Sequence, residues 1–173
     1  EGARLSGFTV TGGSTLCEGT AATDNNSGAG IFCAEAPMGT KGNPLPETLV
    51  TDCIVSNNAC QYGGGGAYRG CRVVRCRFFD NGSWQEGGAL ADCCIYGCVF
   101  DRNYGMYGVS QPREVRGCTF GPETFGWSKT GSRCALRSDP NSAVWPVYNC
   151  LFLGGTRCPV KHVYNCIEPE SDF

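Results

Sequence analysis

Histidine, charge and long apolar runs are all scarce in this 173-residue chain. His162 is the single histidine, and no serine or carboxylate arrangement accompanies it, so neither a catalytic triad nor a usual zinc site is predicted. No run of 18 apolar residues occurs, and we therefore expect no membrane insertion. The chain begins at Glu1 without an initiator methionine, and we expect it to be a segment of a longer protein.

Charged residues make up 17% of the chain, and the formal net charge is −2. This balance predicts no general attraction to nucleic acid or to anionic membranes, so we expect no nucleic-acid partner. Several arginines cluster between residues 69 and 116, but aspartates interleave with them. Such interleaving favours surface ion pairs over a groove for a polyanion.

Cysteine, in contrast, is abundant, with 14 residues. No two cysteines form a Cys-x-x-Cys pair, so we expect no metal site and no cofactor. Two interpretations stay open: disulfides formed in an oxidising compartment, and reduced thiols that pack as small apolar side chains. We favour packed thiols for the six repeated cysteines described next. The other eight are freer to pair, and Cys71 and Cys93 occupy matching positions one repeat apart.

An internal repeat places six cysteines at one equivalent position: Cys53, Cys76, Cys98, Cys118, Cys150 and Cys166. The first three spacings are 23, 22 and 20 residues, a period typical of solenoids. An aliphatic residue lies three positions before each cysteine, and an apolar residue lies two positions after most of them. This two-residue step indicates short strands with one buried face. We therefore expect the first five of these cysteines, from Cys53 to Cys150, to stack inward beside a column of phenylalanines: Phe78, Phe100, Phe120 and Phe152.

Two further columns predict turns. Asparagine follows the cysteine by five residues at Asn58, Asn81 and Asn103, where it tolerates the left-handed conformation and can form a hydrogen-bonded ladder between repeats. Glycine-rich steps at residues 28–30, 64–66 and 87–88 predict tight corners at which the backbone takes positive φ.

Three segments resemble a known family of repeats: residues 7–13 (GFTVTGG), 53–58 (CIVSNN) and 64–68 (GGGAY). They are similar to the right-handed parallel β-helix repeats of bacterial surface and secreted proteins, the pectate-lyase-like superfamily in its broad sense. The resemblance covers roughly residues 5 to 167. It implies an all-β fold, with residues 1–173 forming a single right-handed parallel β-helix of about seven coils. It implies no single activity, because the superfamily includes polysaccharide lyases, glycoside hydrolases and adhesin domains.

Three intervals break the period and are predicted to be loop insertions: residues 14–27, 34–48 and 121–142. Insertions project from solenoids and often carry binding specificity. Neither end of the chain offers an obvious cap for the strand edges of a coil. We therefore expect flanking sequence of a longer chain, or another copy, to cover the end coils.

The nearest approach to a catalytic arrangement is a pair of aspartates, Asp80 and Asp101, with Arg77 close in sequence. They occupy turn positions of adjacent repeats, where two carboxylates could act on a glycosidic bond. We favour the alternative that they are solvated turn residues beside the asparagine column. On this interpretation the chain is not an enzyme.

Four aromatic residues sit at positions whose parity allows them to point outward: Phe79, Tyr96, Tyr148 and Tyr164. Exposed aromatic rings on a strand face suit stacking on sugars, so carbohydrate is the ligand class that we expect. Burial under a loop or a neighbouring subunit is the alternative.

Three functional hypotheses follow. The first is an extracellular or cell-surface β-helix that serves as a structural or adhesive module. The second is a fragment of a polysaccharide lyase or glycoside hydrolase, which a cluster of carboxylates along one face would favour. The third is a subunit that stacks head to tail into a filament through its end coils.

Overall fold

The computed structural model describes residues 2–15, 26–33, 48–122, 124–126, 134–137, 146–154, 156–157 and 163–168. Most of the first two predicted insertions lies outside these residues. The third predicted insertion includes two strands, Phe125–Gly126 and Cys134–Arg137, so this interval contributes to the sheets and is not one continuous loop.

The described residues form 23 short strands and no helix, and the strands assemble into four parallel sheets. Sheet 1 contains β1 (Arg4–Ser6), β4 (Leu49–Thr51), β8 (Arg72–Val74), β12 (Cys94–Tyr96), β16 (Glu114–Arg116), β20 (Val147–Tyr148) and β23 (Val163–Tyr164). Sheet 2 contains β2 (Thr9–Thr11), β5 (Ile54–Ser56), β9 (Arg77–Phe79), β13 (Val99–Asp101), β17 (Thr119–Phe120) and β21 (Leu151–Phe152). Sheet 3 contains β6 (Ala59–Cys60), β10 (Gly82–Ser83), β14 (Tyr104–Gly105) and β18 (Phe125–Gly126). Sheet 4 contains β3 (Ile31–Phe32), β7 (Ala67–Tyr68), β11 (Gly87–Ala91), β15 (Tyr107–Ser110), β19 (Cys134–Arg137) and β22 (Thr156–Arg157).

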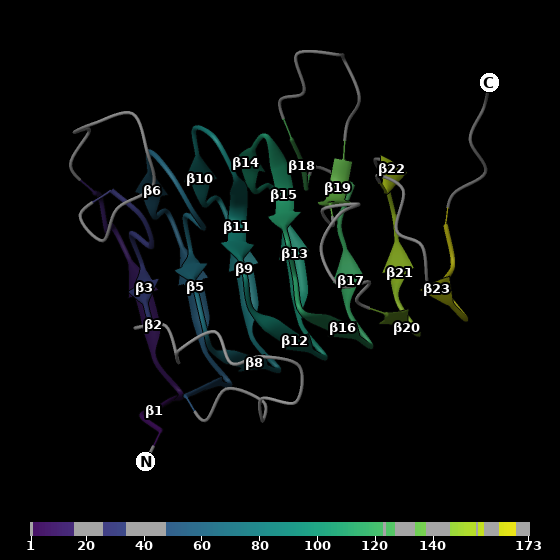
Figure 1. The fold of residues 1–173 in the computed structure, drawn as a ribbon, viewed down its shortest axis with the longest axis horizontal. Helices are drawn as coiled ribbons and strands as arrows, with labels where there is room; N and C mark the ends of the chain where they lie inside the picture. Colours follow the sequence, from purple (N-terminus) through teal and green to yellow (C-terminus); the bar gives the residue numbers. More distant parts are fainter. Residues whose placement is uncertain are drawn as a thin grey trace, which may run out of the picture.

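The chain visits these sheets in a fixed order. From β4 it passes through β5, β6 and β7 and returns to sheet 1 at β8, and the next two repeats follow the same path. Each strand therefore pairs in parallel with the strand one repeat away, as in the pairs β4–β8 and β8–β12. Figure 1 shows the result as rows of side-by-side strands that progress from the N-terminus to the C-terminus along the long axis. This all-β arrangement of stacked parallel sheets is compatible with a β-helix.

The predicted phenylalanine column is confirmed. Neighbouring ring centroids lie 5.4 Å apart for Phe78 and Phe100, 5.1 Å apart for Phe100 and Phe120, and 4.7 Å apart for Phe120 and Phe152. All four side chains are buried. The strand register aligns them directly, because Phe100 pairs with both Phe78 and Phe120 in sheet 2.

The cysteine column lies beside the phenylalanines, at the corner between sheets 1 and 2. The five cysteines that were expected to point inward are all buried: Cys53, Cys76, Cys98, Cys118 and Cys150. The main-chain N–H of Cys53 donates to Sγ of Cys76 at 3.4 Å, and that of Cys76 donates to Sγ of Cys98 at 3.5 Å. Each of these sulfurs therefore meets a backbone amide of the neighbouring repeat.

The asparagine ladder is also present. The Nδ2 group of Asn58 donates to Oδ1 of Asn81 at 2.9 Å, and the Nδ2 group of Asn81 donates to Oδ1 of Asn103 at 2.9 Å. All three side chains are fully buried. The ladder continues to the first repeat through Gly13, whose main-chain N–H donates to Oδ1 of Asn58 at 2.9 Å.

The left-handed residues of this turn are not the asparagines of the ladder. Positive φ occurs one position earlier, at Asn57, Asp80 and Arg102. A second left-handed column immediately precedes the six repeated cysteines: Asp52, Arg75, Gly97, Gly117, Asn149 and Asn165. In the first repeat the equivalent left-handed residue is Gly7, which precedes Phe8. The explanation by left-handed tolerance is therefore wrong for the ladder, whose asparagines are required for their paired amide hydrogen bonds.

The prediction of positive φ at the glycine-rich corners holds for Gly28, whose φ is 66°, and is wrong for residues 64–66 and 87–88, which are not among the residues with positive φ. Their glycines allow close approach instead. A Cβ atom on Gly64 would lie 1.8 Å from the carbonyl oxygen of Ala67, and one on Gly65 would lie 2.2 Å from that of Gly82. Backbone, not a movable side chain, fills the space that any larger residue would need.

Candidate functional site

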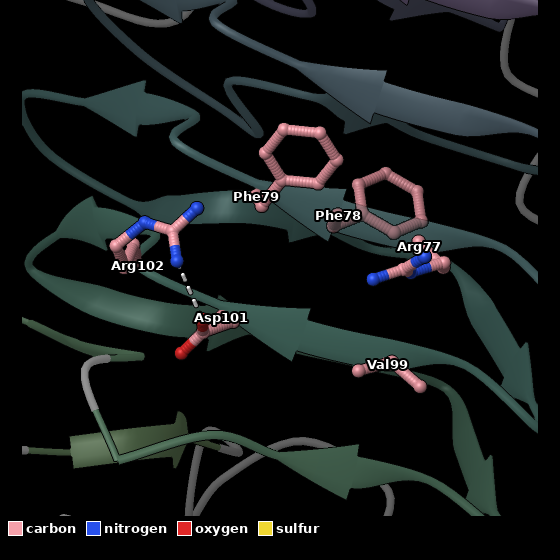
Figure 2. A pocket seen from close by; sticks show the side chains of 6 residues that line it. All are labelled: Arg77, Phe78, Phe79, Val99, Asp101 and Arg102. Carbon is pink, nitrogen blue, oxygen red and sulfur yellow. Dashed lines mark hydrogen bonds and ion pairs between the residues drawn. The ribbon is translucent and has the colours of Figure 1, made fainter.

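A small groove of about 140 Å³ lies on the outer face of sheet 2, over strands β9 and β13 (Figure 2). Its lining consists of Arg77, Phe78, Phe79, Val99, Asp101 and Arg102. The groove therefore contains three residues that the sequence singled out on separate grounds: Arg77 and Asp101 as catalytic candidates, and Phe79 as a binding candidate.

The strand alternation explains why these residues meet. Phe78 points into the core, so its neighbours Arg77 and Phe79 project from the outer face. In the next strand Val99 pairs with Arg77, and Asp101 pairs with Phe79. The 22-residue repeat thus places two short rows of outward side chains side by side, with Val99 41% exposed between the polar ends.

Arg102 holds both candidate carboxylates. Its Nε group donates to Oδ1 of Asp80 at 2.9 Å, and its Nη1 group donates to Oδ2 of Asp101 at 2.9 Å. The guanidinium carbon also lies 6.0 Å from the centroid of the Phe79 ring. Arg102 therefore compensates the charge of two aspartates and partly covers the aromatic ring at one end of the groove.

Gly121 supports this arrangement from the next repeat. A Cβ atom at this position would lie 2.4 Å from Oδ1 of Asp101. A side chain at Gly121 would therefore require the Asp101 carboxylate to shift.

Arg77 stands at the other end of the groove. Its side chain is exposed, and Figure 2 shows its guanidinium on the opposite side from that of Arg102. Among the described residues, no carboxylate forms an ion pair with Arg77. The groove therefore offers an anion one uncompensated guanidinium next to an apolar surface.

The two catalytic candidates do not face each other across this groove. Asp80 occupies a left-handed turn position with a φ of 56° and does not line the groove. Asp101 lies at the end of β13 and does line it. A glycosidase needs two carboxyl groups on either side of the bond that it cleaves. The groove itself supplies one.

The tyrosine candidates lie elsewhere, in one row on the outer face of sheet 1. Arg116 occupies the same row, between Tyr96 and Tyr148, and Tyr164 follows Tyr148. The rings of Tyr148 and Tyr164 stack with centroids 5.0 Å apart, and the guanidinium of Arg116 lies 4.5 Å from the centroid of Tyr148. Both faces of Tyr148 are therefore occupied by protein groups, which leaves no face for a sugar ring.

The same row is tied together by hydrogen bonds. The hydroxyl of Tyr96 donates to Oε2 of Glu114 at 2.6 Å, and Arg116 pairs with the other oxygen of that carboxylate. Burial, together with the hydrogen bond to Glu114, raises the pKa of Tyr96. This row is an internally bonded surface network, and we do not place the binding site there.

Sequence reasoning missed one carboxylate, Glu86, which lies half-buried in the connection between sheets 3 and 4. Burial raises the pKa of Glu86, and the charge of nearby Asp92 adds to this effect, while Arg69 and Arg137 oppose it. The sequence gives no signal for this cluster beyond the position of Glu86 directly before a glycine pair.

Within the described ranges, no three His, Cys, Asp or Glu side chains are grouped to hold a metal ion. The part of the chain that the structure describes also has no helix long and apolar enough to span a membrane.

Fold and groove together define an all-β repeat protein of stacked parallel sheets with a cationic, partly apolar surface site. Comparisons of the chain with protein-family models, with curated proteins and with solved structures find no match. The functional argument therefore depends on the residues of the groove.

Proposed function

We propose that this chain forms a right-handed parallel β-helix of about seven coils and serves as an extracellular, non-catalytic scaffold that binds acidic glycans at the groove on sheet 2. The observation that carries the proposal is Arg77, a guanidinium without a carboxylate partner among the described residues, beside Phe79 and Val99.

The chemistry of the groove matches one sugar unit that bears a carboxylate. A volume of about 140 Å³ is below the range of roughly 300–1,000 Å³ that holds a whole small-molecule ligand, so it fits a single ring of a longer chain. Arg77 can bind the carboxylate with two parallel hydrogen bonds. Phe79 and Val99 provide apolar contact for the ring, and Asp101 can accept a hydrogen bond from a hydroxyl group.

Binding without turnover is supported by the same geometry. The groove contains the Asp101 carboxylate, and this group is already paired with Arg102. The second carboxylate, on Asp80, belongs to a turn outside the lining. A lyase or hydrolase mechanism would need a further acid or base at the bound sugar.

Isothermal titration with a uronic-acid oligosaccharide, and with the neutral hexose oligosaccharide of the same length, tests the proposal. We expect the acidic oligosaccharide to bind and Arg77→Gln to weaken binding at least tenfold. Arg75→Gln is the matched control, because it removes the same charge from an exposed arginine that pairs with Asp52 instead of lining the groove. Equal affinity for the neutral oligosaccharide, or unchanged binding by Arg77→Gln, would contradict the proposal.

The enzymatic alternative is tested by incubating the full chain with acidic polysaccharides. We expect neither new reducing ends nor unsaturated products. Turnover that disappears in Asp80→Asn but persists in Asp52→Asn would instead identify a lyase or hydrolase.

Head-to-tail association is a second candidate, favoured by the apolar side chains of the outermost coils. Phe8 in the first coil is 59% exposed, and Leu153 and Ile167 near the other end are 52% and 67% exposed. If end coils stack, light scattering should show growth with concentration that Ile167→Asp abolishes. Trp84→Asp, at a side chain 78% exposed on a different part of the surface, should leave the growth unchanged. A chain that stays monomeric at high concentration would contradict this candidate.

A further inference from the structure

A second set of cysteines lies at the corner where sheet 4 leads into sheet 1. The Sγ atoms of Cys71 and Cys93 lie 3.3 Å apart, and both side chains are fully buried. Cys33, from the preceding repeat, is also buried. The direct sulfur–sulfur contact at this corner is the one between Cys71 and Cys93.

The backbone holds Cys71 and Cys93 directly opposite each other. The main-chain N–H of Gly70 donates to the carbonyl of Asp92 at 3.1 Å, and that of Cys94 donates to the carbonyl of Cys71 at 3.0 Å. Neighbouring parallel strands are about 4.8 Å apart. This spacing lies within the Cα separation of roughly 4.4–6.8 Å that a disulfide can span.

We propose that Cys71 and Cys93 form a disulfide that joins two successive repeats when the protein matures in an oxidising compartment. Formation of this disulfide in the cell rests on the proposed extracellular location. The same oxidation can be tested on the isolated chain. It does not depend on glycan binding by the groove.

The reaction requires an external disulfide as oxidant, such as oxidised glutathione. The thiolate of one cysteine attacks this disulfide, forms a mixed disulfide and releases one glutathione thiol. The thiolate of the second cysteine then attacks the protein-bound sulfur and releases the second glutathione. The two cysteines lose two electrons and two protons, and the glutathione disulfide is reduced to two thiols.

The folded corner disfavours the thiolate that starts this reaction. Hydrogen bonding of the Cys71 thiol to the sulfurs of Cys33 and Cys93, together with burial, raises the pKa of Cys71 well above its ordinary value. We therefore expect the bond to form while the repeats are stacking, when both sulfurs are still accessible, and to be shielded from reductant afterwards.

Refolding the reduced chain in a glutathione redox buffer, followed by alkylation and tryptic mapping without reduction, tests the proposal. Trypsin releases Cys71 in the tripeptide of residues 70–72 and Cys93 in the peptide of residues 78–102. We expect most chains to yield these two peptides joined. Because the longer peptide also contains Cys94 and Cys98, fragmentation between residues 93 and 94 locates the bond.

Two variants complete the test. Cys93→Ala should leave the tripeptide alkylated at Cys71, whereas Cys94→Ala, which alters the adjacent buried cysteine, should leave the cross-link intact. Alkylated Cys71 in the refolded wild-type chain would overturn the proposal, as would linkage of Cys71 to Cys33, Cys94 or Cys98. Glycan titration of the oxidised and reduced chains should give the same affinity, so failure of the disulfide and failure of the groove are distinguishable.

Discussion

The two cysteine columns of this molecule use the same residue in different ways. In the inner column, between sheets 1 and 2, the sulfurs of Cys76 and Cys98 accept the main-chain N–H groups of the preceding repeat. At the corner between sheets 4 and 1, the sulfur of Cys93 contacts the sulfur of Cys71. Both columns are buried, so burial alone does not decide whether a cysteine packs or pairs. The 3.3 Å contact between two sulfurs is the feature that marks Cys71 and Cys93.

The largest expected effect concerns the packing beside the inner column. Phe100→Ala removes a ring that stacks between Phe78 and Phe120, and the gap cannot close without moving both neighbours. We expect a loss of about 3–5 kcal/mol in the free energy of unfolding, measured by urea denaturation under reducing conditions. Phe79→Ala is the matched control, because this outward ring lines the groove and should cost much less. Equal losses would show that the interior does not depend on the stack.

The interior columns could be predicted from the sequence because the repeat itself supplies the register. Cysteines 22 or 23 residues apart, with phenylalanine two residues later, leave few arrangements in which both sets face inward. The conformation of the corners could not be predicted in the same way. Asn81 and Asp80 are adjacent and both suit turns, and tertiary hydrogen bonds decide that Asp80 takes positive φ while Asn81 joins the ladder.

The groove was predictable only in part. Periodicity brings Phe79 and Asp101 side by side, and both were candidates. The sequence does not show that Arg102 forms ion pairs with both Asp80 and Asp101, because these pairs depend on the rotamers of long side chains. For the same reason the sequence does not predict that Arg116 and Tyr164 cover the two faces of the Tyr148 ring.

A redox comparison of the two cysteine columns has the next largest expected effect. The proposed disulfide closes a loop of about 23 residues, which corresponds to about 3 kcal/mol of stabilisation in the chain-entropy model. We expect Cys93→Ala to lose this amount relative to the wild type when both are oxidised, and much less when both are reduced. Cys98→Ala should lose about 1 kcal/mol in either state, because its sulfur packs in the core and bonds to backbone groups.

Thermal or urea unfolding with and without reductant measures both variants. A redox-dependent loss for Cys98→Ala, or none for Cys93→Ala, would reverse the distinction between the columns.

Asn81→Ala tests whether the ladder is as important as the sulfur columns. The substitution leaves the main-chain N–H of Asn58 without its acceptor and Oδ1 of Asn103 without one of its donors. The Nδ2 group of Asn58 loses one acceptor and keeps its bonds to main-chain carbonyls. Buried polar groups without partners cost about 1–3 kcal/mol, and we expect a loss of this size. A loss below about 0.5 kcal/mol, the usual size for surface positions, would show that water replaces the amide.

The smallest expected effect is a pH dependence from Glu86. Because burial raises the pKa of this carboxyl group, the folded chain binds its proton more tightly than the unfolded chain does. Stability should therefore fall as the pH rises from the ordinary pKa of glutamate to the raised pKa, and stay lower above it. Glu86→Gln removes this decrease, so the variant should be slightly more stable at pH 7, by no more than about 0.5 kcal/mol.

Asp52→Asn provides a control of opposite sign for Glu86→Gln. Hydrogen bonds from Arg75 and Thr51 lower the pKa of the Asp52 carboxyl group, so the folded chain releases that proton more readily than the unfolded chain. The stabilisation from this group is present above the ordinary pKa of aspartate and is lost as the pH falls through the lowered value. Unfolding measured across the acidic range should thus show Glu86→Gln gaining and Asp52→Asn losing stability at neutral pH, with both differences shrinking in acid. A gain in stability for both variants would contradict the opposite effects that we expect from the raised pKa of Glu86 and the lowered pKa of Asp52.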